Sequence, residues 1–295
     1  MPEDGLPPMR RSCFLGIMKR MSDLRDILIE NWDQLHDAVF ENVWNPDIMR
    51  YRNNRVYRGM SDGQWALTPS LNRTCPQDLT LEKILLRSFM KYGYAELQGC
   101  NSFWELVAMG QQFGLPTRLL DWTYSPLVAA HFATEDVDYY DRDGVIWCVN
   151  IEDVNANLPP ALHQLLTEQR ADIFTRDILE GVARNFTALQ ALSDKPFALF
   201  FEPASTVNRI ANQYALFSTV SDPAVTLLDL PESEHFTRLI ISKKAKLEIR
   251  DKLDYINISE RMIYPGLDGI CRWIARRYAP LGPRYNADHA GEEQP

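Results

Sequence analysis

The sequence lacks any pair of closely spaced cysteines. Its five cysteines are an odd number, they are scattered over 295 residues, and none forms a Cys-x-x-Cys pair. A disulfide framework and a cysteine-based zinc site both require regular spacing, so neither is expected. We predict reduced thiols in a cytoplasmic protein, with no metal site.

Long apolar runs are also missing. No stretch approaches the roughly 18 residues that cross a bilayer, and the apolar run at Cys13–Met18 is shorter than the hydrophobic region of a secretory signal. A membrane partner is therefore not expected. We predict that residues 1–20 form a poorly ordered extension and that residues 280–295 form a disordered tail, because that end has almost no apolar content.

An excess of positive charge is absent as well. The chain carries 40 acidic and 31 basic residues, which gives a net charge of −9. This balance opposes long-range attraction to a phosphate backbone, so bulk nucleic acid is not the expected partner. A local basic pocket can still bind a small anion.

The common catalytic motifs are absent too. The sequence contains no HExxH, no Walker loop, no GxGxxG and no GxSxG. These absences argue against a zinc metalloprotease, a P-loop enzyme, a dinucleotide-binding Rossmann domain and an α/β-hydrolase. The five histidines lie in unrelated contexts, at His36, His131, His163, His235 and His289.

The hydrophobic pattern predicts helices and strands that are interspersed without a regular β–α–β rhythm, which is typical of an α+β fold. Helices are expected to begin after Ser22, at Ser102 with Glu105 completing a capping box, and at Ser125-Pro126. Two further helices are expected over 81–92 and 267–278. The expected strands are 55–59, 144–151, 197–201, 214–217 and 239–241.

The segment from Gln111 to Pro126 is the densest in candidate residues. It is expected to connect two helices over about ten residues, yet it is apolar, so its backbone must find partners within the fold. Two interpretations stay open. Arg118 and Asp121 can form a structural pair that locks the loop. Alternatively the loop forms a cleft wall, where Arg118 binds an anion and the helix start at Ser125 offers amides to a phosphate.

Two other segments have similar alternatives. Arg58 follows a short strand and precedes Gly59, so it is either a surface charge or a clamp for a diphosphate or carboxylate. Gln213 lies between Arg209 and an apolar strand, where its amide either completes a strand-start hydrogen bond or serves the site.

These segments together resemble the FRG domain family. The resemblance is carried by Tyr57-Arg58-Gly59, by Gly114-Leu-Pro-Thr-Arg-Leu-Leu-Asp-Trp-Thr123 with Ser125-Pro126 and Phe132-Ala133, by Arg209, Gln213 and Phe217, and by Tyr264-Pro-Gly-Leu-Asp-Gly269. The matching order runs over about residues 50–275, so we predict one FRG domain over 21–279. The chain departs from the family at Gln112, where histidine is frequent, and at Tyr214-Ala215, where glycine is common.

The same pattern is distantly similar to ADP-ribosyltransferases. That likeness implies an ADP-ribosyltransferase-like, mainly antiparallel split sheet with flanking helices, with NAD as the substrate and no metal. It places Arg58, Asp121 and Gln213 in the catalytic group, with Gln213 at the position of the usual acid and Asp121 able to supply the charge. By the same likeness Arg58 holds the NAD diphosphate, and Thr117, Thr123 and Ser125 lie near the nicotinamide ribose. The other nucleotide-binding residues we predict are Tyr57, Gln112, Arg118, Trp122 and Arg209.

We therefore expect an NAD-binding ADP-ribosyltransferase-like enzyme, of the kind found in toxins and phage-defence effectors, acting on an unknown macromolecular target. One alternative is an enzyme that acts on nucleotide or nucleic-acid phosphates, using Arg58, Arg118 and Arg209 as clamps. A second alternative is a non-catalytic protein-recognition module, in which the tryptophans and the apolar loop form a partner surface.

Overall fold

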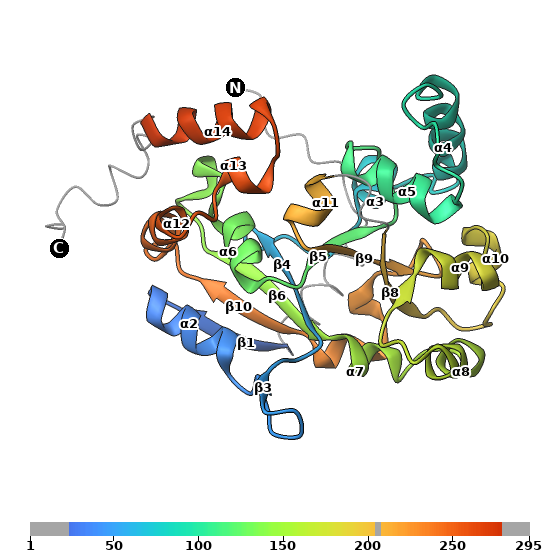
Figure 1. Ribbon diagram of the computed structural model, residues 1–295, viewed down its shortest axis with the longest axis horizontal. Helices are drawn as coiled ribbons and strands as arrows, with labels where there is room; N and C mark the ends of the chain where they lie inside the picture. Colours follow the sequence, from blue (N-terminus) through green and yellow to red (C-terminus); the bar gives the residue numbers. More distant parts are fainter. Residues whose placement is uncertain (1–23, 204–207, 279–295) are drawn as a thin grey trace, which may run out of the picture.

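The fold is built on one eight-stranded sheet, drawn in Figure 1. The computed structural model of the chain describes residues 24–203 and 208–278, so the predicted extension and tail lie outside the described residues. The strand order is β1-β10-β6-β4-β5-β9-β8-β7. The strands of this sheet are β1 (Arg25–Ile29), β4 (Arg55–Met60), β5 (Leu120–Thr123), β6 (Gly144–Asn150), β7 (Phe174–Thr175), β8 (Ala198–Glu202), β9 (Ala215–Val220) and β10 (Thr237–Ile241).

The sheet is mainly antiparallel, with a parallel pair at each edge. The pairs at its two edges, β1 with β10 and β7 with β8, are parallel, and the pairs between them are antiparallel. The predicted α+β class and the predicted mainly antiparallel sheet are confirmed, and the parallel pairs at the two edges make the sheet mixed. The likeness to ADP-ribosyltransferases stays a prediction. A separate two-stranded ribbon is formed by β2 (Trp44–Asn45) and β3 (Arg50–Tyr51).

Helices flank the sheet and cover its faces (Figure 1). The α-helices are α2 (Trp32–Phe40), α3 (Ser70–Thr74), α4 (Leu81–Tyr92), α5 (Phe103–Gln112), α6 (Pro126–Thr134), α7 (Ile151–Asn155), α8 (Pro160–Gln169), α9 (Arg176–Val182), α10 (Phe186–Gln190), α11 (Asn208–Asn212), α12 (Lys246–Tyr255), α13 (Glu260–Ile263) and α14 (Leu267–Tyr278). Short 3₁₀ turns lie at η1 (Val137–Tyr139), η2 (Leu227–Asp229) and η3 (Pro231–His235).

One face of the sheet packs against a single continuous hydrophobic core, and the other face packs against two separate hydrophobic cores. Val56, Leu120, Trp147 and Leu216, from four different strands, belong to the continuous core. On the opposite face, the half of the sheet that ends at β4 packs against α2, α6 and α12. On the same face, the strands β7, β8 and β9 pack against α5, α8 and α9. The strand β5 lies between these two groups of strands and contributes no side chain to either core of this face.

The junction of β4 and β5 is the weakest pairing in the centre of the sheet. β4 pairs with β6 along its whole length from Arg55 to Met60, but with β5 only through Tyr57 opposite Thr123. Because a strand that leaves its neighbour exposes backbone polar groups, those groups must find other partners. The junction is thus the place in the sheet where a side chain can enter between two strands.

Local signals predicted several elements well. Two helices occupy the predicted spans, α4 over 81–92 and α14 over 267–278. The Ser125 side chain accepts a hydrogen bond from the Val128 amide at the start of α6, which confirms the predicted cap. Ser102 likewise caps α5 by accepting from the Trp104 amide. The capping box was wrong, because Glu105 pairs with Arg176 instead.

Two predictions were wrong because pairing across the sheet decided the structure. The segment after Ser22 was expected to be a helix, but 25–29 forms β1, whose partner is β10, and the helix begins at Trp32 with Asn31 as its cap. The connection from Gln111 to Pro126 was expected to be a loop, but its residues Leu120–Thr123 form β5 between β4 and β9. Strand pairing satisfies the backbone groups of this apolar segment.

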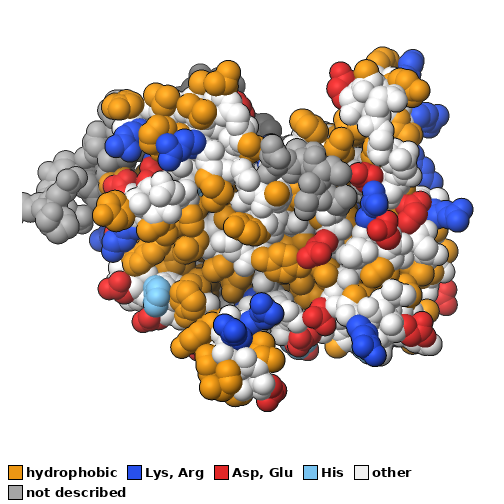
Figure 2. All heavy atoms as spheres, viewed as in Figure 1, with side chains coloured by type: hydrophobic (Ala, Val, Ile, Leu, Met, Phe, Trp, Pro, Cys, Tyr) orange, Lys and Arg blue, Asp and Glu red, His pale blue; other side chains and the backbone are white. Residues whose placement is uncertain are grey.

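Apolar side chains also gather on two parts of the surface. Figure 2 shows them on the β2–β3 ribbon and along α14, where Met49, Tyr51, Leu267 and Tyr278 are all more than two-thirds exposed. Within the described ranges, no helix is both long and apolar enough to span a membrane.

Candidate functional site

Arg58 occupies the junction of β4 and β5. Its Nη1 atom donates a hydrogen bond of 2.7 Å to the backbone carbonyl of Asp121 and lies 3.5 Å from the Asp121 Oδ2 atom. The Arg58 side chain is 19% exposed, and its buried Nε atom has no hydrogen-bond partner among the described residues. Burial lowers the pKa of Arg58, and the charge of Asp121 opposes that shift. The guanidinium therefore keeps unused donor capacity in a partly desolvated place.

Gly59 allows helix α6 to lie in direct contact with β4. A Cβ atom built on Gly59 would lie 1.8 Å from the carbonyl oxygen of Ala129 in α6. The helix thus rests directly on β4 beside Arg58, and no larger residue fits between them. This close approach fixes the position of α6, whose first turn is capped by Ser125.

Asp121 places a carboxylate at the same junction. Its side chain is 41% exposed, and Oδ2 accepts a hydrogen bond of 2.7 Å from the Gln111 amide. Gln111 is held in turn by Thr117, whose hydroxyl donates to Gln111 Oε1 at 2.6 Å. Asp121 is therefore positioned by hydrogen-bonded side chains, and its carboxylate remains accessible to a ligand.

Arg73 is a second guanidinium close to Arg58. It lies on α3 and donates a hydrogen bond to the backbone carbonyl of Thr68. Burial lowers the pKa of Arg73, and repulsion by the charge of Arg58 adds to that shift. This residue was not predicted from the sequence, since nothing in its local sequence links it to β4.

The Arg118 guanidinium forms its hydrogen bonds with other residues of the fold. Its Nε and Nη2 atoms donate to Glu82 Oε2 at 2.8 and 2.5 Å, and Nη1 donates to the Ser221 carbonyl at 3.2 Å. The guanidinium also stacks 4.0 Å from the Phe186 ring centre. Both partners of the ion pair are buried. The structure thus matches the structural interpretation of Arg118, with Glu82 rather than Asp121 as its partner.

Four other predicted nucleotide-binding residues make contacts within the fold. The buried Tyr57 side chain packs among apolar residues, and burial raises its pKa to about 12. The Trp122 indole donates to the Ser218 hydroxyl at 2.8 Å. The Thr123 hydroxyl donates to the Gln213 carbonyl and accepts from the Ser125 amide. These contacts support the β5 strand and the start of α6, and a role in binding stays a prediction.

The Gln213 side chain makes its hydrogen bond away from the Arg58–Asp121 pair. Its buried amide donates to the Ile263 carbonyl at 3.4 Å, and no hydrogen bond joins its side chain to Arg58 or Asp121 within the part of the chain that is described. Arg209, one turn earlier, donates to the Gln112 carbonyl at 3.2 Å and stacks 4.9 Å from the Tyr264 ring. The predicted catalytic group is therefore brought together only in part.

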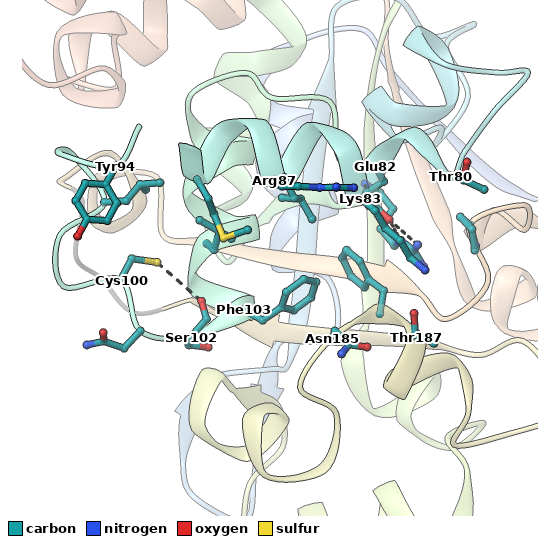
Figure 3. A pocket seen from close by; sticks show the side chains of 18 of the residues that line it. Thr80, Glu82, Lys83, Arg87, Tyr94, Cys100, Ser102, Phe103, Asn185 and Thr187 are labelled. Atoms are coloured by element: carbon teal, nitrogen blue, oxygen red, sulfur yellow. Dashed lines mark hydrogen bonds and ion pairs between the residues drawn. The ribbon is translucent and has the colours of Figure 1, made fainter. Parts of the chain in front are cut away.

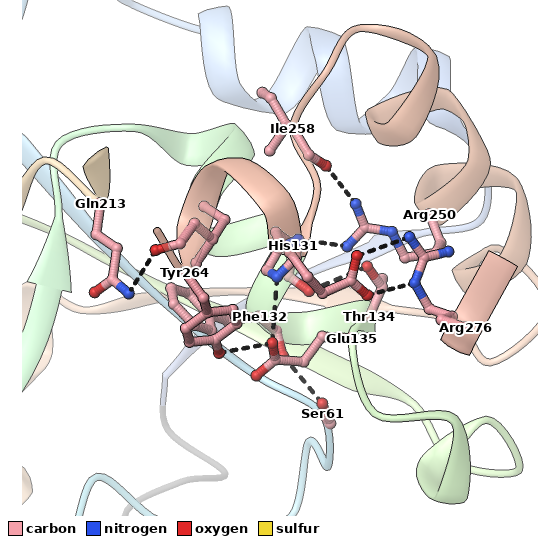
Figure 4. A network of polar contacts seen from close by, with 12 residues as sticks. Ser61, His131, Phe132, Thr134, Glu135, Gln213, Arg250, Ile258, Tyr264 and Arg276 are labelled. Atoms are coloured by element: carbon pink, nitrogen blue, oxygen red, sulfur yellow. Dashed lines mark hydrogen bonds and ion pairs between the residues drawn. The ribbon is translucent and has the colours of Figure 1, made fainter. Parts of the chain in front are cut away.

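A buried polar network lies next to Gln213 and was not anticipated from the sequence. Figure 4 shows His131 between Arg250 and Glu135, with Tyr264 on the other side of Glu135. Arg250 Nη1 lies 2.7 Å from His131 Nδ1, and the Tyr264 hydroxyl donates to Glu135 at 2.9 Å. His131 Nε2 lies 3.2 Å from Glu135 Oε2 but outside hydrogen-bond geometry.

Electrostatics keep this network in a defined protonation state. Burial lowers the pKa of His131, and the charge of Arg250 adds to that effect, while Glu135 opposes it. Burial and the charge of Glu135 raise the pKa of Tyr264. The imidazole is therefore neutral near pH 7, with Nδ1 accepting from Arg250. Across residues 24–203 and 208–278, no group of acidic, histidine or cysteine side chains could hold a metal ion.

Together these observations describe an α+β protein whose mixed sheet carries an arginine–carboxylate pair at a central strand junction. Residues 53–142 match the FRG domain, and the chain carries an FRG domain. The match includes Arg58, Arg73, Gln111 and Asp121 but ends before Gln213. No curated protein and no solved structure matches the chain. The extension of the domain to 21–279 stays a prediction.

Proposed function

We propose that the junction of β4 and β5 binds the diphosphate of a nucleotide, with NAD as the substrate, and that the protein transfers ADP-ribose to a target. The observation that supports this most is the Arg58 guanidinium, which is largely buried and has an Nε atom without a partner among the described residues. A desolvated guanidinium binds phosphate oxygens strongly, because water competes little for its donors.

Two neighbours support a diphosphate as the ligand. Arg73 adds a second positive charge beside Arg58. The hydrogen bond from Arg58 to the Asp121 carbonyl holds the guanidinium plane in one orientation, which is what bidentate recognition of phosphate requires. The two phosphates of a diphosphate relieve the repulsion between the two cations.

Asp121 supplies the charge that the transfer reaction needs. In ADP-ribosyl transfer the bond between the ribose C1′ atom and the nicotinamide nitrogen breaks, and nicotinamide leaves with the bonding electrons. The target nucleophile then bonds to C1′ and loses a proton. The ribose carries positive charge at the transition state, and a carboxylate at fixed distance stabilises it.

This assignment gives Gln213 a supporting role. Its side chain is neutral and its amide is turned toward the Ile263 carbonyl, so it supplies no charge to a nucleotide. We assign it to holding the start of β9 beside Thr123, through the Gln213 carbonyl that accepts from the Thr123 hydroxyl. The catalytic carboxylate is then Asp121 alone.

The test is calorimetric titration with NAD and with ADP-ribose, followed by a transfer assay with labelled NAD in a cell lysate. Binding of both ligands and label on a protein or nucleic acid would support the proposal. Binding without label transfer would limit the site to nucleotide recognition. If oligonucleotides bind instead, with an affinity that falls steeply as salt rises, the chain acts on nucleic-acid phosphates.

A further inference from the structure

Arg118 forms part of the wall of a hollow in the surface. Its volume is about 930 Å³, and it lies between α4, the segment leading into α5 and the start of α10. Neither Arg58 nor Asp121 lines it. Small-molecule sites in proteins have volumes of about 300–1,000 Å³, so this cavity is large enough for a ligand.

The walls of the cavity are mainly apolar. Figure 3 shows α4 on one side and Phe103, Asn185 and Thr187 on the other. The α4 wall presents Leu86 and Met90, which lie about one helical turn apart. The opposite wall adds apolar rings and an aliphatic side chain, at Phe103, Leu106 and Phe186. An apolar chain or ring would be buried between these two walls.

The charge of the lining is opposite to that of the chain as a whole. Its only carboxylate is Glu82, which is already bound by the Arg118 guanidinium. Lys83 and Arg87 also line the cavity, and neither forms an ion pair with an acidic side chain in the described ranges. The lining therefore has a surplus of two positive charges, whereas the chain has a net charge of −9.

Lys83 and Arg87 can meet a single anionic group. They are four residues apart on α4, so their Cβ atoms lie about 5–6 Å from each other on one helix face. Their position beside Leu86 and Met90 joins a cationic end to an apolar wall. A ligand that fits this combination has one negative head group and one apolar chain.

We propose that this cavity binds a small single-chain amphiphile with an anionic head, of the acyl carboxylate class. The head group lies between Lys83 and Arg87, and the chain lies along Leu86 and Met90 against Phe103. The Glu82–Arg118 ion pair forms a neutral part of the floor. This site is separate from the nucleotide site and does not depend on the proposed transfer reaction.

The experiment is calorimetric titration of the full chain with dodecanoate below its micelle concentration. Dodecyltrimethylammonium, which has the same chain and a positive head, is titrated in parallel. The proposal predicts saturable binding of one dodecanoate per chain and weaker binding of the cationic amphiphile. Absence of saturable dodecanoate binding, or equal binding of the two amphiphiles, would overturn it.

Three variants locate the binding. Arg87→Glu should weaken dodecanoate binding by about tenfold, because one attraction becomes a repulsion. Lys91→Glu is the matched control, since Lys91 is exposed on the same helix but does not line the cavity, and its binding should stay near that of the wild type. Met90→Trp fills the cavity from a half-exposed position and should reduce binding with little effect on stability.

Equal losses of dodecanoate affinity in Arg87→Glu and Lys91→Glu would show that binding depends only on the overall charge of the protein. The assignment to this cavity would then be wrong. Unchanged binding in Met90→Trp would place the amphiphile elsewhere. Thermal unfolding of each variant without ligand separates these outcomes from a loss of fold.

Discussion

The Nη1 atom of Arg58 lies 2.7 Å from the carbonyl oxygen of Asp121, across the point where β4 and β5 separate. This hydrogen bond replaces the ladder bonds that the two strands do not make beyond Tyr57 and Thr123. It satisfies a carbonyl of the central sheet with a charged donor, and it leaves the Nε atom of the same guanidinium unpaired among the described residues. One arginine thus joins the two halves of the sheet and retains capacity to bind an anion.

The buried pair of Glu82 and Arg118 should be required for stability. Arg118→Met leaves the Glu82 carboxylate buried without its partner, so the free energy of unfolding should fall by roughly 3–5 kcal/mol. Arg25→Met removes the exposed pair with Glu41 and should cost at most about 1 kcal/mol. Denaturant titration of both variants measures the difference. Similar losses in the two variants would contradict a structural role for Arg118.

Gly59 should not tolerate a methyl group. Gly59→Ala forces its Cβ atom against the Ala129 carbonyl, so the free energy of unfolding should fall by about 3 kcal/mol or more. Gly181→Ala is the control on α9, where the added Cβ atom meets nothing within 4 Å, and it should raise stability by roughly 0.5–1 kcal/mol. A stable Gly59→Ala variant would show that α6 can move away from β4.

The neutral state of His131 should give the protein a pH-dependent stability. Burial lowers the pKa of His131 in the folded state from its ordinary value of 6.5, against the opposing charges of Glu135 and Glu260. The stability contributed by the neutral ring is complete above about pH 6.5 and falls as the pH drops, because the unfolded chain then binds the proton more readily.

The expected result is a shallower loss of stability in His131→Gln between pH 7 and pH 5. The difference from the wild type should reach at most about 1.4 kcal/mol per pH unit. His36→Gln, at an exposed histidine, is the control and should follow the wild type. The measurement is the slope of unfolding free energy against pH, so a constant loss of stability in the variant does not disturb it. Parallel slopes for His131→Gln and the wild type would contradict a neutral buried imidazole.

Asp121 should affect turnover more than substrate binding. If its carboxylate stabilises charge on the ribose, Asp121→Asn lowers kcat for labelled transfer by about 10²–10³-fold, while KM for NAD changes little. Asp177→Asn, at an exposed aspartate on α9, should leave both constants unchanged. A rise in KM with an unchanged kcat would assign Asp121 to binding alone.

Helices whose own residues supply a cap or a periodic apolar face were predictable from the sequence. The helices at α4, α5, α6 and α14 carry their own caps or periodic apolar faces, so their starts or spans were correct. The strand β5 could not be recognised in this way. It has only four residues, one of them Asp121, and its partners in β4 and β9 are distant in sequence. β1 was missed for the same reason.

The site was predictable to a similar extent. The resemblance to the FRG family drew attention to both Arg58 and Asp121, and the structure brings them into contact. Arg73, Gln111 and His131 were missed, because each gains its role from a neighbour that the fold supplies. Arg118 was the hardest to interpret, since its partner Glu82 lies on α4, 36 residues earlier in the sequence.

Two arginines of the same strand give the sharpest test of the proposed nucleotide site. Arg58 faces the junction with β5, whereas Arg55 reaches the Glu41 carbonyl away from it. We expect the wild type and Arg55→Ala to bind ADP-ribose with similar affinity in calorimetric titration. Arg58→Lys should bind at least about tenfold more weakly, because a lysine lacks the planar guanidinium fork. No binding by the wild-type protein, or equal affinities for Arg58→Lys and Arg55→Ala, would contradict the proposed site.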